Sequence, residues 1–306
     1  MEFPRQLRVQ LRQTPPGTLK NPEGASIWQC RDRQLDVGRG PLIMGILNVT
    51  PDSFSDGGRF LDPDSAVRHG LELVEAGAAI VDVGGESSRP GSRRIPADEE
   101  LRRVLPVIRG LAAQSDCVIS VDTMKSEVAR RALDAGAHIV NDISAGRWDP
   151  EMFGVVAAYG AGMVLMHMQG EPETMQRNPE YGDVVKEVRD FLVVRLGACV
   201  EAGIARDSVA VDPGIGFGKT LEHNLELLAA IQRLKEVGRP VVIGASRKSF
   251  IGLLTGREVG ERLAGSLAVA AYCVLRGADI LRVHDVAETR DVVELIQALR
   301  KREGTQ

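Results

Sequence analysis

Polar or charged side chains come in, or just beyond, each of eight short apolar segments in this chain. They are Asn48, Asp82, Asp122, Asn141, His167, Asp212, Lys248, Arg282 and His284. One carboxylate in such a position usually caps a helix or lies on the surface. The same arrangement repeated along the whole chain indicates instead that many segments deliver side chains to one place, which would be a binding or catalytic site.

Four of these side chains suit the edge of a flat, nitrogen-rich ring. They are Asp122, Asn141, Asp212 and Lys248. A carboxylate accepts two parallel N–H bonds of the kind that an amino-pyrimidinone offers, and an amide or an ammonium group adds donors. The sequence therefore predicts a subsite for such a heterocycle.

A second group suits a polyanion and consists of Asn48, Ser88, Arg89, Arg282 and His284. A guanidinium can bind phosphate oxygens through two parallel bonds, and the Asn48 oxygen suits a hard divalent ion that keeps most of its waters. Taken alone, Arg282 and His284 would fit a surface ion pair equally well. We expect the two subsites to be separate, so that loss of Arg282 leaves binding of the ring almost unaffected.

Short β-branched apolar segments alternate eight times with segments of helical periodicity from residue 42 onward, which predicts βαβ units in a parallel sheet. The expected strands are 42–47, 79–83, 118–121, 138–140, 163–166, 209–211, 241–244 and 280–283. Helical segments include 64–76, 97–113, 125–135, 181–201, 221–235 and 257–276. Eight units in this length are typical of an α/β fold of the (β/α)8 TIM-barrel type, in which the carboxyl ends of the strands share one rim.

Two segments after the first two strands, 48–58 and 84–92, are too polar and glycine-rich for a core and too long for minimal turns. We interpret them as mobile lids that carry groups of the site.

The predicted organisation is a single catalytic domain, 27–302, preceded by a flexible N-terminal arm, 1–26. Turn-forming residues in the arm, such as Pro15, Pro16 and Gly17, favour loose chain over packed structure. Residues 27–37 are expected to form a small hairpin that closes the bottom of the barrel.

The bulk composition points to a small-molecule enzyme. A formal net charge of −4 and a charged fraction of 26% with both signs mixed do not favour nucleic acid or an acidic membrane as partners. No apolar run reaches the roughly 18 residues of a spanning helix. The 4 cysteines are far apart, which favours buried free thiols over a zinc site or a disulfide framework. We expect a cytoplasmic protein.

The segment MGILNVTPDSFSDGG, residues 44–58, resembles the signature of the dihydropteroate synthases, a family of pterin-binding TIM barrels. Later motifs of that family have similar counterparts in the same order, namely ESSRPG at 86–91, SVDT at 120–123, VNDI at 140–143, LMHM at 165–168, DPGIGFGK at 212–219, SRKS at 246–249 and RVHD at 282–285. Ser88 stands where many members carry threonine, which keeps the hydroxyl, and the arm before Ile27 is longer than expected.

This resemblance implies a Mg²⁺-assisted transfer in folate biosynthesis. The pterin substrate, 6-hydroxymethyl-7,8-dihydropterin diphosphate, would lose diphosphate while 4-aminobenzoate captures its methylene carbon. The implied catalytic residues are Asp122, Asp212, Lys248, Arg282 and His284, and the implied metal ligand is Asn48. A homodimer through the last helices is also implied.

The resemblance further assigns each binding residue to a ligand. The pterin residues are Asp122, Asn141, Ile143, Met166, Asp212, Gly216, Phe217 and Lys248. Diphosphate is expected at Asn48, Ser88, Arg89, Arg282 and His284, and 4-aminobenzoate at Phe54, Arg89, Pro90, Phe217 and Ser249. Ordinary core packing explains Ile143 and Met166 equally well.

Two alternatives stay open. A pterin-dependent methyltransferase domain shares the barrel and the pterin pocket, although the 44–58 segment and the SRKS motif argue against it. A catalytically silent pterin-binding protein on the same fold is the other alternative, since fold alone does not determine function.

Overall fold

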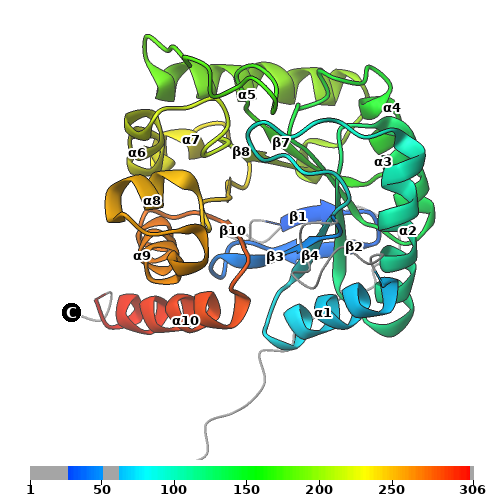
Figure 1. Ribbon diagram of the computed structural model, residues 1–306, viewed down its shortest axis with the longest axis horizontal. Helices are drawn as coiled ribbons and strands as arrows, with labels where there is room; N and C mark the ends of the chain where they lie inside the picture. The colour runs from blue at the N-terminus through cyan, green and yellow to red at the C-terminus, as the bar shows by residue number, and fades with distance from the viewer. Residues whose placement is uncertain (1–26, 51–61, 304–306) are drawn as a thin grey trace, which may run out of the picture.

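The computed structural model describes residues 27–50 and 62–303. The predicted N-terminal arm, 1–26, lies outside these residues, and so does Phe54. The predicted barrel is confirmed: eight strands alternate with helices around a closed ring (Figure 1).

Every neighbouring pair in the main sheet is parallel, in the order β8-β7-β6-β5-β4-β3-β10-β9. The strands are β3 Leu42–Asn48, β4 Ile80–Gly84, β5 Val118–Asp122, β6 Ile139–Asp142, β7 Gly162–Met166, β8 Val209–Asp212, β9 Val242–Ile243 and β10 Ile280–Val283. A parallel bridge between Val211 and Val241 joins the two ends of the sheet and closes the barrel. β4 and β7 are buried along their whole length, as strands covered on both faces must be.

Helices surround the barrel and connect its strands (Figure 1). They are α1 Pro63–Glu75, α2 Ala97–Gln114, α3 Ser126–Asp134, α4 Met152–Tyr159, α5 Val184–Glu201, α6 Leu221–Ala229, α7 Ile231–Lys235, α8 Ser249–Thr255, α9 Leu263–Leu275 and α10 Val286–Glu303. The predicted helix 221–235 is divided at Ala230 into α6 and α7. The predicted helix 257–276 begins only at Leu263, after a short 3₁₀ turn at Val259–Glu261. No helix among the described residues is long and apolar enough to span a membrane.

The amino-terminal end of the barrel is closed by the predicted hairpin, β1 Ile27–Cys30 and β2 Arg33–Asp36, which pair antiparallel. Trp28 is fully buried, and its indole Nε1 donates to the Ser208 carbonyl at 2.9 Å. The hairpin's apolar side chains pack against the first residues of the barrel strands, such as Met44 and Ile139. All described functional candidates lie at the opposite ends of those strands.

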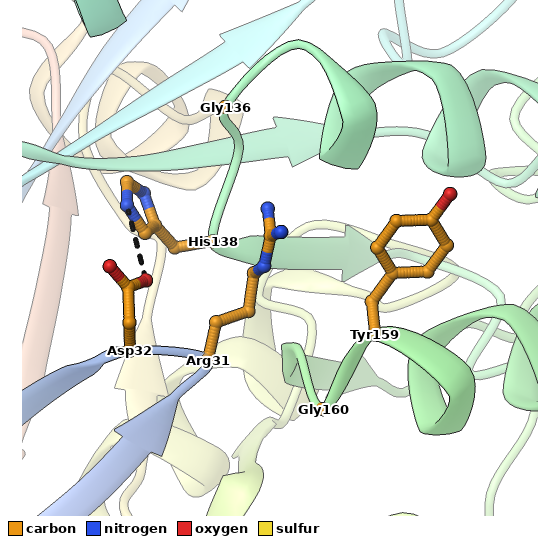
Figure 2. A pocket seen from close by; sticks show the side chains of 6 residues that line it. All are labelled: Arg31, Asp32, Gly136, His138, Tyr159 and Gly160. Carbon is orange, nitrogen blue, oxygen red and sulfur yellow. Dashed lines mark ion pairs between the residues drawn. The ribbon is translucent and has the colours of Figure 1, made fainter. Parts of the chain in front are cut away.

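A pocket of about 480 Å³ lies beside this hairpin, lined by Arg31, Asp32, Gly136, His138, Tyr159 and Gly160 (Figure 2). Arg31 Nη1 donates to the carbonyls of Leu133 and Ala137 at 2.8 and 2.7 Å, so its main role is to fasten the hairpin to the end of α3. The His138 ring accepts a hydrogen bond from the Ile119 amide at Nδ1, and its Nε2 lies 3.9 Å from Asp32 Oδ1.

Burial lowers the pKa of His138 to about 4, although Asp32 opposes the shift. The unfolded chain therefore binds the proton more readily than the folded chain, and stability should fall as pH drops from the ordinary histidine pKa of about 6.5 towards 4. Urea unfolding at pH 7.5 and pH 5.0 measures this loss. Between these two pH values, the free energy of unfolding should fall by on the order of 2 kcal/mol less in His138→Gln than in the native chain.

His69→Gln provides the control for replacing a histidine outside the core, because His69 is exposed on α1, where its Nδ1 lies 3.2 Å from Glu72 Oε2. Equal pH dependence in His138→Gln would show that His138 ionises alike in both states.

Candidate active site

The rim of the barrel collects the predicted polar groups, and the order of the strands sorts them into two halves. β5, β6, β7 and β8 carry the ring-binding candidates, in the order Asp122, Asn141, Met166 and Asp212. β4, β3 and β10 carry the anion-binding candidates, in the order Ser88 and Arg89, then Asn48, then Arg282 and His284. Lys248 follows β9, next to both Asp212 and Arg282.

The side chain of Arg282 joins the two halves. Its Nε donates to Asp82 Oδ2 at 2.7 Å, and its Nη2 donates to Asp122 Oδ2 at 2.8 Å. Asn141 Nδ2 donates to the same Asp82 oxygen at 3.0 Å. One guanidinium therefore binds a carboxylate of the ring-binding half, a link between the two predicted subsites that the sequence analysis did not anticipate.

Asp82 is a polar residue of the second predicted strand to which the sequence analysis assigned no ligand. It is fully buried in the middle of β4, and its second oxygen has no hydrogen-bond partner among the described residues. An aspartate inside the apolar run Ile80–Gly84 was the available signal, because a buried carboxylate requires a compensating partner. Here the partner is Arg282, which comes from a strand 200 residues away.

Burial raises the pKa of Asp122 above its ordinary value, while Arg282 opposes the shift and the neighbouring Asp82 adds to it. Burial also raises the pKa of Asp212, against the Gly214 amide, which donates to Asp212 Oδ1 at 2.7 Å. The two carboxylates thus lie in an environment that penalises their charge. A ligand that offers N–H groups or develops positive charge there would be stabilised.

Lys248 lies against this acidic side of the rim. Burial lowers its pKa to about 8, with Arg282 contributing and Asp212 opposing. Its Nζ lies 4.0 Å from the centre of the Phe217 ring. The ammonium group is therefore placed over an aromatic face and beside a carboxylate, where it can donate to an acceptor atom of a ring held between them.

A buried apolar cluster forms the wall of the ring-binding half. It contains Met124, Ile143, Met166, Met168, Met175 and Phe217. The predicted Ile143, Met166 and Phe217 are brought together, and three further methionines join them. Methionine and phenylalanine supply a flat, polarisable surface suited to the face of a heterocycle.

In the glycine-rich segment after β8, the backbone approaches neighbouring groups more closely than residues with side chains would allow. At Gly214, which has φ +70°, a Cβ atom would lie 1.9 Å from the His167 carbonyl oxygen, so no other residue fits. The predicted Gly216 has φ +81°, and its amide donates to Asn224 Oδ1 at 2.6 Å. A Cβ at Gly216 would lie 3.2 Å from the Lys248 side chain, so the glycine leaves room for that lysine.

Lys219 binds groups next to this apolar wall. It was not selected from the sequence as a site residue. It is 3% exposed, and its Nζ lies 3.0 Å from His167 Nδ1 and donates to the Phe217 carbonyl at 3.0 Å. Burial lowers the pKa of Lys219 to about 7 and that of His167 to about 2. His167 therefore stays neutral and accepts from Lys219, which ties the end of β7 to the segment carrying Phe217.

The anion-binding half is more open. His284 Nδ1 lies 3.1 Å from the Ser246 hydroxyl, and burial lowers the His284 pKa to about 4. A neutral His284 that accepts at Nδ1 carries its proton on Nε2, and can donate it to an anion. Ser88 is half-buried, whereas Arg89 and Pro90 are exposed on the segment between β4 and α2.

The candidates for the second substrate are less well defined. Ser249 is exposed at the first position of α8, and Phe217 is buried in the ring-binding wall. Phe54 lies outside the described residues. In the described part of the chain, no hydrogen bond or ion pair joins Arg89, Pro90, Phe217 and Ser249 to one another. The structure therefore places these residues around the rim without assembling them into one cluster.

Asn48 fits a metal site of a particular kind. A Cβ atom built on Gly84 would lie 3.7 Å from Asn48 Oδ1 and 3.8 Å from Asp122 Oδ2, so the bare glycine leaves a small space beside two oxygens. No group of three or more His, Cys, Asp or Glu side chains that could hold a metal occurs in the described part of the chain. This donor set suits Mg²⁺ held mainly by substrate phosphate and water.

Comparison with known proteins agrees with this site. Residues 44–284 match the model of the family described as pterin binding enzyme. The chain is 47% identical over 258 residues to the dihydropteroate synthase of Escherichia coli strain K12, covering 84% of this chain and 91% of that protein.

Solved structures are equally similar. The Xanthomonas albilineans dihydropteroate synthase with 4-aminobenzoic acid superposes with a TM-score of 0.85 at 49% identity, covering 90% of this chain and 98% of the other. The enzyme from the same organism in complex with 7,8-dihydropteroate has a TM-score of 0.82 at 47% identity, with the same coverage. With a barrel rim that offers carboxylates and a flat apolar wall to a heterocycle, this chain belongs to the pterin binding enzymes and, among them, to the dihydropteroate synthase family.

Proposed function

We propose that this enzyme joins 6-hydroxymethyl-7,8-dihydropterin diphosphate to 4-aminobenzoate, giving 7,8-dihydropteroate and diphosphate. It is a transferase of folate biosynthesis, as its family membership states. The observation that carries the residue assignments is the division of the rim into a carboxylate-rich half with an apolar wall and a half that carries cationic and hydroxyl donors. A pterin that bears a diphosphate needs these two environments side by side.

The pterin would lie in the first half. Asp212 and Asp122 would accept N–H bonds from its amino-pyrimidinone edge, and Asn141 would add a further contact. Lys248 would donate to the ring carbonyl or N5, and Ile143, Met166, Gly216 and Phe217 would flank its faces. As the bond to diphosphate breaks, positive charge grows on the pterin, and the buried carboxylates would stabilise it.

Diphosphate would lie in the second half and leave with the electron pair of the C–O bond. Arg282 and His284 would stabilise the negative charge that develops on it, together with Ser88 and Arg89. We propose Asn48 as the protein ligand of Mg²⁺, which neutralises phosphate charge when bound. Arg282 would respond to the binding of both the pterin and the diphosphate, because it already binds Asp122 and Asp82.

The amine of 4-aminobenzoate would attack the methylene carbon, forming the C–N bond and losing a proton afterwards. An aniline nitrogen attacks without prior deprotonation, so no strong general base is required. We assign this acceptor to Arg89, Pro90, Phe217 and Ser249, together with Phe54, which lies outside the described residues. The charge of Arg89 suits the carboxylate of the acceptor.

The direct experiment follows diphosphate release with the pterin diphosphate and 4-aminobenzoate as substrates. A methyltransferase or a silent pterin-binding protein would release none. In the same assay Asp212→Asn should lower turnover by on the order of 100-fold, because one oxygen acceptor becomes an N–H donor and a paired contact is mismatched.

Calorimetry with a pterin that lacks the diphosphate provides the companion measurement. Asp212→Asn should weaken this binding as well. Unchanged affinity in a folded variant would remove Asp212 from the pterin subsite.

We also propose that the enzyme is a homodimer that acts in the cytoplasm. Exposed apolar side chains gather on α8, α9 and α10, which lie together at one side of the barrel (Figure 1). They are Leu253, Leu254, Leu263, Leu275, Leu295 and Leu299. Exposed leucines on three neighbouring helices make this side of the barrel a candidate interaction surface. Cys30, Cys117, Cys199 and Cys273 are all free thiols, which suits a reducing compartment.

Sedimentation velocity tests the dimer. Leu295 and Leu299 are 62% and 57% exposed, one turn apart on α10. The paired substitution Leu295→Glu with Leu299→Glu should convert the dimer to a monomer, because it would bury like charges at the interface. Val194→Glu, at a 67% exposed position on α5, is the control and should stay dimeric. A monomeric native chain, or dimers in all variants, would contradict this interface.

A further inference from the structure

The segment between β4 and α2, residues 85–96, carries Ser88 and Arg89, and a partly buried hydrogen bond joins its two ends. Glu86 Oε2 accepts the Ile95 amide at 3.2 Å, which ties the two ends of the segment together. The hydroxyls of Ser87 and Ser92 lie 2.9 Å apart and form a second contact within it. The shape of this segment therefore depends on where the Glu86 carboxylate lies.

Lys125 determines that position from outside the segment. Its Nζ donates to Glu86 Oε2 and, at 2.5 Å, to Glu100 Oε2 on α2. Lys125 precedes α3 directly and comes three residues after Asp122, so its backbone is fixed by the end of β5. One ammonium group thus links the segment to the strand that carries a pterin-binding carboxylate.

Burial distinguishes this cluster from an ordinary surface ion pair. The side chains of Lys125, Glu86 and Glu100 are 18%, 12% and 1% exposed. Burial raises the pKa of Glu100, and Lys125 opposes that shift more than any other group. Removing the lysine would leave two buried carboxylates close together without a cation, which is strongly unfavourable.

Other contacts hold different parts of the segment. Arg103 Nη1 donates to the Gly85 carbonyl at 2.9 Å, and the Gly91 amide donates to the Pro172 carbonyl at 3.0 Å. Neither contact lies between Glu86 and Arg89. Ser87 and Ser88 follow Glu86 directly, so the Glu86 carboxylate positions them from one side. Within the segment, the Ser92 hydroxyl and the Arg89 amide contact Ser87 Oγ at 2.9 and 3.4 Å.

We propose that Lys125 and Glu86 are positioning residues, which hold Ser88 and Arg89 where diphosphate and the acceptor bind. The assignment rests on the proposed function of these two side chains. The end of the 85–96 segment that contains Glu86 would then be preformed before substrate binds. Glu100 on α2 would compensate the remaining charge of Lys125. Neither Lys125 nor Glu86 would touch a substrate.

Two variants interrupt the link in different ways. Lys125→Met removes the cation, while Glu86→Ala removes the segment's carboxylate and leaves the buried Lys125 to Glu100 pair intact, so that this variant should fold. Glu86→Gln keeps an oxygen for the Ile95 amide and for Lys125, and serves as the conservative variant. Lys186→Met is the matched control, because Lys186 forms an exposed ion pair with Asp190 on α5.

Amide hydrogen exchange of the substrate-free protein reads the segment directly. Exchange within 85–96 should be faster in Glu86→Ala and Lys125→Met than in the native chain, and native-like in Glu86→Gln and Lys186→Met. Unchanged exchange in a folded Glu86→Ala variant would overturn the proposal.

Kinetics and binding separate positioning from a general loss of structure. The KM for 4-aminobenzoate and the Kd for inorganic diphosphate should rise on the order of 10- to 100-fold in Glu86→Ala, as expected for a displaced binding group. Affinity for a pterin without diphosphate should stay native. An equal loss of pterin affinity would mean that the cluster only stabilises the fold. If the native chain produced no dihydropteroate, the proposed function would fail, and the exchange and diphosphate measurements would still decide the positioning role.

Discussion

One guanidinium at the centre of the barrel rim organises the rest of the site. Arg282 donates to Asp82 and to Asp122, two carboxylates from neighbouring strands β4 and β5, while its own strand β10 lies on the far side of β3. Two carboxylates that bind the same guanidinium would repel each other if that cation were absent. The ion pairs therefore allow both acids to stay at the rim and give the two halves of the site a common wall.

The barrel makes this arrangement possible because each strand ends at the same rim with its own small set of side chains. The hairpin fills the opposite end with Trp28 and Leu35, so the barrel interior below the site is packed apolar core. Lys219 and Lys125, like Arg282, are cations that join neighbouring segments of the rim. Each is a lysine with little exposure that links one rim segment to its neighbour, at His167 and Phe217 in one case and at Glu86 and Glu100 in the other.

Much of the fold could be predicted from periodicity and from residues that punctuate the strands. Eight strand segments agree with the structure because each is an apolar run between turn residues. Helix limits were less predictable: α4, Met152–Tyr159, is apolar on nearly all sides and has little helical periodicity. The division at Ala230 has no marker such as proline or glycine in the sequence, and only packing reveals it.

The site residues that stand at strand ends could be predicted from the sequence. The buried ion pairs and hydrogen bonds that hold these residues in position could not. Arg282 and Asp122 were both selected, yet nothing in their spacing of 160 residues indicates that they bind each other. The position of Asp82 within an apolar strand does not indicate its partner, Arg282. The partners Glu86 and Lys125 are 39 residues apart. Such contacts depend on which strands become neighbours, and they appear only when the barrel is closed.

The measurement that tests the central role of Arg282 most directly is calorimetry of the Arg282→Gln variant with two separate ligands, a pterin without diphosphate and inorganic diphosphate. Arg89→Gln, an exposed arginine on the anion-binding half, is the comparison. If Arg282 joins the two halves, its loss lowers the affinity for both ligands by on the order of tenfold or more. The reason is that a buried carboxylate left unpaired costs at least about 1.4 kcal/mol. Arg89→Gln should weaken diphosphate alone. Native pterin affinity in Arg282→Gln would contradict the account and return the site to two independent subsites.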